Sequence, residues 1–211
     1  MALWRRIILL LVVACGAARV VCAQGYVPYR NLKPADDAIN RSVEMGVVLG
    51  ANYLGIEPSA DVLTLSPKVG FRGGLQMSLV WEQKYALQME VAYAFNKVDS
   101  SLGERKAELR SNIVEVPVMF SYRGLNPVRI GAGVVFAPVA SGRYDVAAER
   151  VEFGQLRQMV GWVADVGVKL TSHLLLDARF VGCFGGVDNY FEGLEFRSRS
   201  WQASFGLGYM F

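Results

Sequence analysis

Apolar residues alternate with polar or small residues through most of the chain, and this period of two limits the possible folds more than any other feature. Between residues 43 and 53 the odd positions carry Val, Met, Val, Leu, Ala and Tyr, whereas the even positions carry Glu, Gly, Val, Gly and Asn. A period of two is typical of β-strands with two unlike faces. Such blocks occur at residues 42–53, 68–81, 85–96, 114–122, 128–136, 160–170, 174–183 and 201–211.

The hydropathy of the chain favours strands that face lipid. Hydrophobic residues make up 53% of the sequence and the mean hydropathy is +0.27, which is high for a soluble domain. Yet after the first two dozen residues no apolar run reaches the roughly 18 residues that a membrane-spanning helix requires. Outer-membrane strands combine these properties because only every second residue meets lipid. A soluble sandwich or calyx is the alternative, and the polar, glycine-rich second face disfavours it.

The connections between the blocks are alternately long and short. Long connections are expected at residues 54–67, 97–111 and 141–157, with tight turns between them. Outer-membrane barrels have long loops outside, short periplasmic turns and an even number of strands. The sequence therefore predicts an all-β fold, an eight-stranded antiparallel up-and-down transmembrane β-barrel in the cell outer membrane.

The N-terminal segment is expected to be a secretory signal peptide, residues 1–23, because two arginines precede an apolar run and a small-residue site ends at Ala23. A polar periplasmic lead-in is expected at residues 24–41 and the barrel at 42–211. Lipidation of Cys15 is the alternative processing. Removal of the leader takes away three arginines and changes the net charge from +3 to 0, so nucleic-acid binding is not expected.

Charged residues also occur on the polar face, where they would point into the lumen. Five acids oppose five bases, which indicates an interior filled by salt bridges, with a narrow solute channel as the alternative. The expected inward charge network consists of Glu44, Lys68, Arg72, Glu90, Glu115, Arg129, Asp165, Lys169, Asp177 and Arg179.

The sequence contains few residues suited to catalysis. His173 is the single histidine and stands near Ser172 and Asp177, but it is expected in a tight turn, so no catalytic, metal or cofactor site is predicted. Cys183 is expected to be a buried thiol. Pro117 cannot donate a ladder hydrogen bond, so it is expected beside a bulge or near the rim.

Several segments resemble the PorT-like outer-membrane β-barrel family of Bacteroidetes. They are VEVPVMFSYR at residues 114–123, VRIGAGVVFAPVASG at 128–142 and the closing ASFGLGYMF. The resemblance implies an outer-membrane barrel. The name-giving member is associated with the type IX secretion system, which exports proteases and adhesins, so secretion-system components are implied as partners.

The final strand carries an aromatic or apolar residue at every second position. This pattern resembles the C-terminal signal that the outer-membrane barrel assembly machinery reads, and it comprises Phe205, Leu207, Tyr209 and Phe211. The assembly machinery and outer-membrane lipids are therefore expected partners. The leading functional hypothesis is a non-enzymatic accessory or scaffold protein; a rim-active lipid-modifying enzyme is the alternative from another class.

Overall fold

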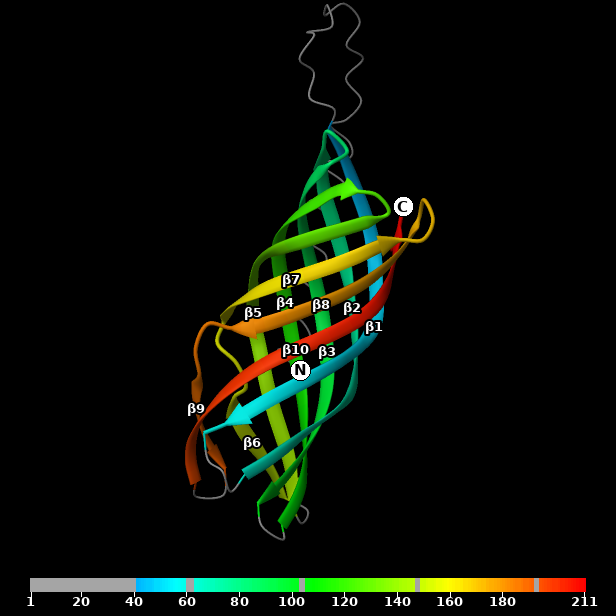
Figure 1. Ribbon diagram of the computed structural model, residues 1–211. Coiled ribbons are helices and arrows are strands. Elements are labelled where there is room, and N and C mark those ends of the chain that lie inside the picture. Colours follow the sequence, from blue (N-terminus) through cyan, green and yellow to red (C-terminus); the bar gives the residue numbers. More distant parts are fainter. Residues whose placement is uncertain (1–40, 60–62, 103–104, 147–148, 192–193) are drawn as a thin grey trace, which may run out of the picture. The chain divides into compact units, whose positions relative to one another are not determined.

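The computed structural model describes residues 41–59, 63–102, 105–146, 149–191 and 194–211. Eight strands form a ring: β1 (Arg41–Pro58), β2 (Leu63–Trp81), β3 (Tyr85–Leu102), β4 (Arg105–Leu125), β5 (Val128–Val146), β7 (Val160–Lys169), β8 (Leu174–Cys183) and β10 (Leu194–Met210). Each strand pairs antiparallel with the next, and β1 pairs with β10, so the sheet closes into an up-and-down barrel (Figure 1). This confirms the predicted fold, and each predicted block lies in a ring strand.

Two shorter strands extend the sheet at one end of the barrel. β6 (Glu149–Gln155) pairs with β5, and β9 (Val187–Phe191) pairs with β10. This end, where β6 and β9 lie, is called the hairpin end and points downward in Figure 1. The opposite end, with the short connections 82–84, 126–127 and 170–173, is called the turn end.

The expected long loops are largely strand instead. Residues 54–67, 97–111 and 141–157 were expected to be connections, but β1 to β6 continue through most of them. β1 to β5 are 18 to 21 residues long, whereas a tilted strand needs only about 9–11 residues to cross a membrane. The sheet therefore continues well beyond the part of the barrel that lipid would surround.

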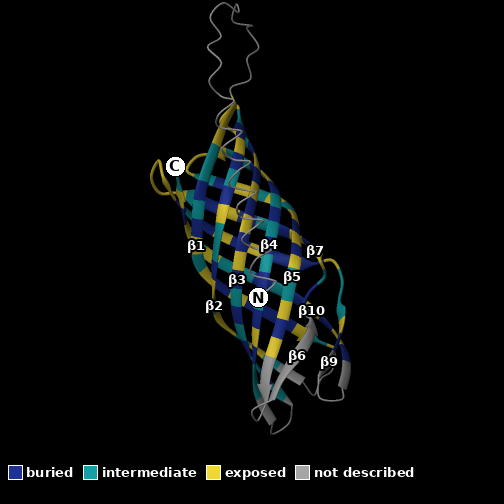
Figure 2. Ribbon diagram, turned by 180° about the vertical axis from the view of Figure 1, so that it is seen from behind, coloured by how far each residue is buried: buried dark blue, intermediate teal, exposed yellow. Residues whose placement is uncertain are grey.

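Side chains alternate between the two faces of the wall. Figure 2 shows buried and exposed residues alternating along the strands. In the part next to the turn end, the outward residues are large and apolar, such as Leu49, Leu87 and Ile130, whereas Gln76, Gln88 and other polar residues are buried inside. The outward face suits lipid and the inward face is polar, as the sequence predicted.

This arrangement reverses towards the hairpin end. There the lumen is filled by apolar residues that we call the apolar cap: Leu54, Ile56, Ala94, Val98, Leu109, Ile113, Ala137, Leu156 and Phe196. The outward side chains at this level include the exposed Glu57 and Arg110 and the half-exposed Asp99. Apolar inside and charged outside is the pattern of a protein in water.

A β-bulge in β2 marks this change on one side of the barrel. Lys68 pairs with Lys97, but Phe71 pairs with Phe95, so Val69 and Gly70 together oppose one residue of β3. An extra residue shifts the alternation by one position. Lys68 therefore lies on the outer face, which corrects the prediction that it points into the lumen.

A second bulge lies near Pro117, which agrees with the predicted position of that residue beside a bulge. The register between β4 and β5 shifts between Val114 and Val116, and Pro117 itself is buried.

Among the described residues, no helix is long and apolar enough to cross a membrane. The predicted signal peptide, Cys15 and the lead-in up to residue 40 lie outside the described residues and stay predictions.

Candidate functional site

Buried charged residues occupy the lumen between the turn end and the apolar cap. Within the described part of the chain, four arginines and four carboxylates are at most 5% exposed. We call this set the lumen network: Arg72, Glu90, Glu115, Arg129, Arg157, Asp165, Asp177 and Arg179. Equal numbers of the two charges leave no net formal charge in this layer.

The first half of the lumen network is built around Glu90 and Glu115. Arg72 lies 2.5 Å from one carboxylate oxygen of Glu90, and Arg179 lies 2.8 Å from the other. Arg157 reaches Glu115 at 2.6 Å, and Arg72 stands 3.9 Å from the same carboxylate. These contacts join β2, β3, β4, β8 and the segment between β6 and β7.

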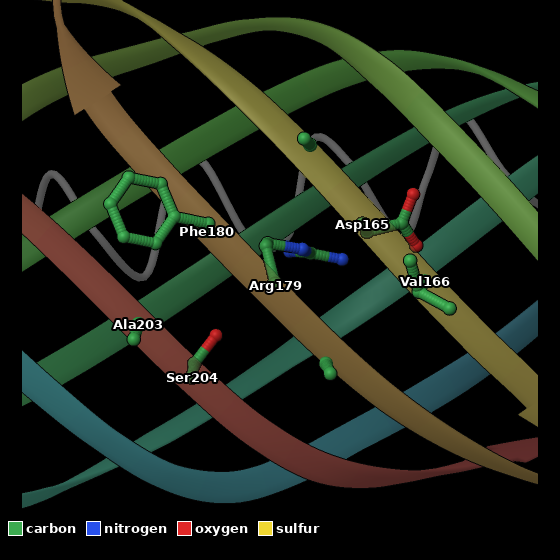
Figure 3. A pocket seen from close by; sticks show the side chains of 8 residues that line it. Asp165, Val166, Arg179, Phe180, Ala203 and Ser204 are labelled. Atoms are coloured by element: carbon green, nitrogen blue, oxygen red, sulfur yellow. The ribbon is translucent and has the colours of Figure 1, made fainter.

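The second half lies closer to the turn end and involves β5, β7 and β8. Arg129 donates a hydrogen bond to Asp177 at 3.1 Å and another to Asp165 at 3.3 Å. Asp165 and Arg179 are direct cross-strand neighbours, and Figure 3 shows the two side chains beside each other. The outer face of the same wall has a depression of about 330 Å³, which is lined by Ala164, Ala178 and other residues.

Pairing of this kind is what makes buried charge tolerable. An ionised side chain in a dry interior is costly unless it is paired and hydrogen-bonded. Every charged side chain of the lumen network has at least one oppositely charged partner within 4.0 Å. An eight-stranded barrel is just wide enough for side chains to fill its interior. The lumen network therefore fills this level of the lumen with paired charges.

The apolar cap closes the lumen a second time. Leu109 and Ile113 of β4 are at most 1% exposed, as is Leu156, which follows β6. Most side chains of this layer are apolar, although the buried Ser100 and Ser111 also face the lumen there, and unpaired charge is costly in such surroundings. The lumen network and the apolar cap thus occupy two successive levels of the lumen that the described residues enclose.

At the turn end the lumen opens into a pocket of about 570 Å³. Glu44 and Arg123 line it and lie 2.6 Å apart, and both are half-buried. Lys169 also lines the pocket, is exposed, and has no ion-pair partner within the described part of the chain. The pocket is the mouth of the lumen at the turn end.

Three residues of the predicted charge network therefore lie outside the buried set. Glu44 and Lys169 stand at the mouth because they are close to the strand ends, and Lys68 is turned outward by the bulge. Arg157 was not predicted, because residues 141–157 were interpreted as a solvated connection. The remaining seven predicted residues meet in the lumen network.

The residues considered for catalysis do not form a site. Ser172 Oγ and His173 Nδ1 are within 2.8 Å, and both residues are exposed at the turn end. Asp177 is 2% exposed inside the lumen and is bound to Arg129. Cys183 is a buried free thiol, 3.4 Å from Ser200. No group of three or more His, Cys, Asp or Glu suited to a metal ion occurs within the described residues.

Aromatic rings lie at two levels of the lipid-facing band, each on part of the ring of strands. Near the hairpin end, Trp162, Phe180, Trp201 and Tyr53 form a continuous run across β7, β8, β10 and β1, with ring centroids 5.5 to 5.9 Å apart. Near the turn end, Trp81, Tyr85, Phe120 and Tyr122 form a second group. Such girdles are typical of the two interfaces of a membrane.

The predicted assembly signal lies on the outer face of β10. Its residues are 47% to 75% exposed: Phe205, Leu207, Tyr209 and Phe211. Tyr209 stacks on His173 and contacts Phe211, with ring centroids 5.8 and 5.7 Å apart. These side chains point away from the lumen. Their recognition by an assembly machinery stays a prediction.

Known proteins of similar sequence and structure agree with this geometry. The family model described as outer membrane protein beta-barrel domain matches residues 23–189. The structure is similar to Neisserial surface protein A, with 16% identity, a TM-score of 0.53, and coverage of 82% of this chain and 99% of that one. It is also similar to Ail, the attachment invasion locus protein of Yersinia pestis, with 11% identity, a TM-score of 0.50, and coverage of 80% and 99%.

Both likenesses are likenesses of fold. No curated protein sequence matches the chain. The family match covers most of the ring strands, and the girdles, the lipid-facing band and the closed ring are the features that such a family requires. The chain belongs to the outer membrane protein β-barrel domain family and is an outer-membrane protein.

Proposed function

We propose that this protein is a non-conducting, non-enzymatic barrel that serves as an accessory or scaffold for other proteins of the outer membrane. The observation that carries this proposal is the doubly closed lumen, with the lumen network below the apolar cap. A barrel whose interior is filled offers only its outer surfaces for function. Binding functions are usually carried by the segments at the ends of a rigid scaffold.

The hairpin end supplies the larger of these surfaces. In outer-membrane barrels the short turns face the periplasm, so the hairpin end faces the cell exterior. β1 to β5 extend beyond the lipid-facing band as paired strands and surround the apolar cap. A packed extension of this kind holds its outer residues in fixed positions, which lowers the entropy cost of binding a partner.

The resemblance to the PorT-like family suggests which partners to test. In that reading the barrel is an accessory of type IX protein secretion and contacts secretion components. Crosslinking and mild-detergent purification from native envelopes, followed by mass spectrometry, tests this directly. Recovery of secretion components supports the scaffold role, whereas recovery of the barrel alone contradicts it.

Matched charge reversals would locate the contact surface. Arg197→Glu with Arg199→Glu alters exposed residues at the hairpin end, and Arg41→Glu with Lys84→Glu alters exposed residues at the turn end. Both pairs change the charge equally. Loss of partners from the first pair alone assigns binding to the hairpin end.

Two measurements test the negative parts of the proposal. Planar-bilayer recordings of the purified barrel are expected to give no conductance steps, and regular steps would favour a channel. Replacement of Ser172, His173 and Asp177 is expected to leave the lipid A mass spectrum unchanged. A changed spectrum would favour the lipid-modifying enzyme instead.

A further inference from the structure

Four basic residues stand side by side on the outer face of the barrel, one on each of four neighbouring strands. In the strand register Lys68 of β2 pairs with Lys97 of β3, Lys97 pairs with Arg110 of β4, and Arg110 pairs with Arg143 of β5. We call this set the basic row. Neighbouring strands are about 4.8 Å apart, so the basic row spans about 15 Å of the wall.

On β2 and β3 the basic row lies immediately beyond the lipid-facing band, whereas on β4 and β5 the outward polar residues Asn112 and Ser141 lie between the two. On β3 the outward residues from Tyr85 to Phe95 are apolar or aromatic, and Lys97 is the next outward residue. Ten residues of a tilted strand rise by about 25 Å, which equals the height of the apolar band of an outer-membrane barrel. Lys97 therefore lies at the level of the lipid headgroups of the outer leaflet.

Two members of the basic row are paired with acidic residues whose side chains the structure describes. Lys68 lies 2.7 Å from Asp99 and 3.7 Å from Glu108, and Arg110 lies 2.7 Å from Glu108. The hydrogen bond from Arg110 lowers the pKa of Glu108, so this carboxylate is charged at neutral pH. Both acids are one outward position further from the membrane than their partners. They hold the side chains of Lys68 and Arg110 in place from the side that faces away from the membrane.

Lys97 and Arg143 form no ion pair with a side chain that the structure describes. The charge of Lys97 nevertheless helps to lower the pKa of Glu108, and the exposed Arg143 stands opposite Glu152 of β6 in the strand register. The bulge at Val69 and Gly70 shifts the alternation of side chains in β2 and so brings Lys68 to the outer face. Without the bulge, the basic row would lose its first member.

We propose that the basic row binds the phosphate groups of a phosphorylated glycolipid in the outer leaflet. Phosphate oxygens accept hydrogen bonds from lysine and, in a bidentate manner, from arginine. The apolar and aromatic residues of the adjoining lipid-facing band contact the acyl chains of the same lipid. The proposal goes beyond the scaffold function and does not depend on it.

The test uses the full barrel in phosphatidylcholine nanodiscs, with lipid A as the probe and native mass spectrometry as the readout. Lys97→Glu with Arg143→Glu reverses the charges of the other two members of the basic row. The control, Arg41→Glu with Lys84→Glu, makes the same charge change at the turn end. We expect the first variant to retain at least about tenfold less lipid A than wild type, because each basic residue near an anionic membrane surface contributes about fivefold in affinity. The control should match wild type.

Further probes separate phosphate recognition from other contacts. The wild-type barrel should retain dephosphorylated lipid A only weakly. The amount retained should equal that of intact lipid A on the reversed variant. If the reversed variant refolds poorly, Lys97→Gln with Arg143→Gln removes the same charges without adding repulsion. Equal retention by wild type and either variant would overturn the proposal, and so would an equal loss in the control.

A soluble polyanion is the other occupant that the experiment can reveal. If a sulfated polysaccharide binds the wild-type barrel more tightly than lipid A does, and the reversed variant loses it, the basic row serves a soluble ligand and the lipid proposal fails. If lipid A binds tightly and the polysaccharide binds weakly, the proposal stands.

Discussion

Glu90 on β3 and Arg179 on β8 lie 2.8 Å apart in the middle of the lumen, although their strands stand on opposite sides of the ring. Between these strands lie three others in each direction, β4, β5 and β7 on one side and β2, β1 and β10 on the other. The ion pair is therefore a brace across the diameter of the barrel. Arg72 binds the same carboxylate, so Glu90 connects two arginines.

Replacement of Glu90 by Gln should destabilise the barrel strongly. The change leaves Arg72 and Arg179 buried with a weaker partner, and breaking a buried ion pair from one side costs about 3–5 kcal/mol. Urea unfolding in lipid vesicles measures the free energy of unfolding. Glu57→Gln, on the exposed outer face, is the control and should change it by less than about 0.5 kcal/mol. Similar unfolding midpoints for the two variants would contradict the brace.

Replacement of Gly70 by Ala should disturb the bulge in β2. An added Cβ at Gly70 would collide with the carbonyl oxygen of Phe95 and stand 3.0 Å from the Cα of Asn96, both backbone atoms that cannot move aside cheaply. We expect a loss of about 1–3 kcal/mol, as for other overpacked sites. Gly208→Ala is the matched control, because there the nearest atoms would be 3.6 Å away. A stable Gly70→Ala variant would show that the register can shift.

Replacement of Leu109 by Ala should loosen the hairpin end alone. Leu109 is 1% exposed inside the apolar cap, and a cavity left by such a change costs about 2–5 kcal/mol. Hydrogen exchange should increase in β4 and β5 near the cap while the lipid-facing band stays protected. Leu49→Ala is the control, because Leu49 is 56% exposed on the outer face and its removal leaves no internal cavity. Uniform exchange throughout the barrel would contradict a separate cap.

The thiol of Cys183 should be unreactive in the folded barrel. It is 8% exposed, lies inside the lumen wall and contacts Ser200. Maleimide labelling followed by peptide mapping should therefore modify it only after unfolding. Ser59→Cys places a thiol on an exposed residue of the hairpin end and should react on intact cells with a reagent that does not cross membranes. Labelling of Cys183 on intact cells would mean that the cap admits small molecules.

The alternation of the sequence was enough to predict the ring and most of its interior. Asp165, Asp177 and Arg179 were placed in the lumen by parity alone, because one face of each strand had to meet lipid. Parity failed at Lys68, since a bulge inserts one residue and leaves no periodic signal in the sequence. Gly70 is the residue that accompanies the bulge, but glycine is too common in this chain to identify a bulge by itself.

The apolar cap was missed although the sequence carries a signal for it. Leu54 and Ile56 keep the inward parity of Asn52, yet they are apolar, and Leu109 and Ile113 of β4 do the same. The face that points inward stays the same while its polarity reverses. Because these residues were interpreted as loop, the reversal was interpreted as the end of the strand instead of the end of the membrane. Arg157 was missed for the same reason.

β1 and β10 pair from Gly46 and Met210 to Pro58 and Ser198, so the first strand of the ring meets the last. A ribosome finishes β1 long before it reaches β10, and an unpaired strand edge pairs readily with foreign chains. One edge of β1 therefore has to be shielded during the whole of synthesis and export. The ring cannot be completed step by step. For this chain, the seam is the place where a chaperone has the most to protect and an assembly factor has the most to release.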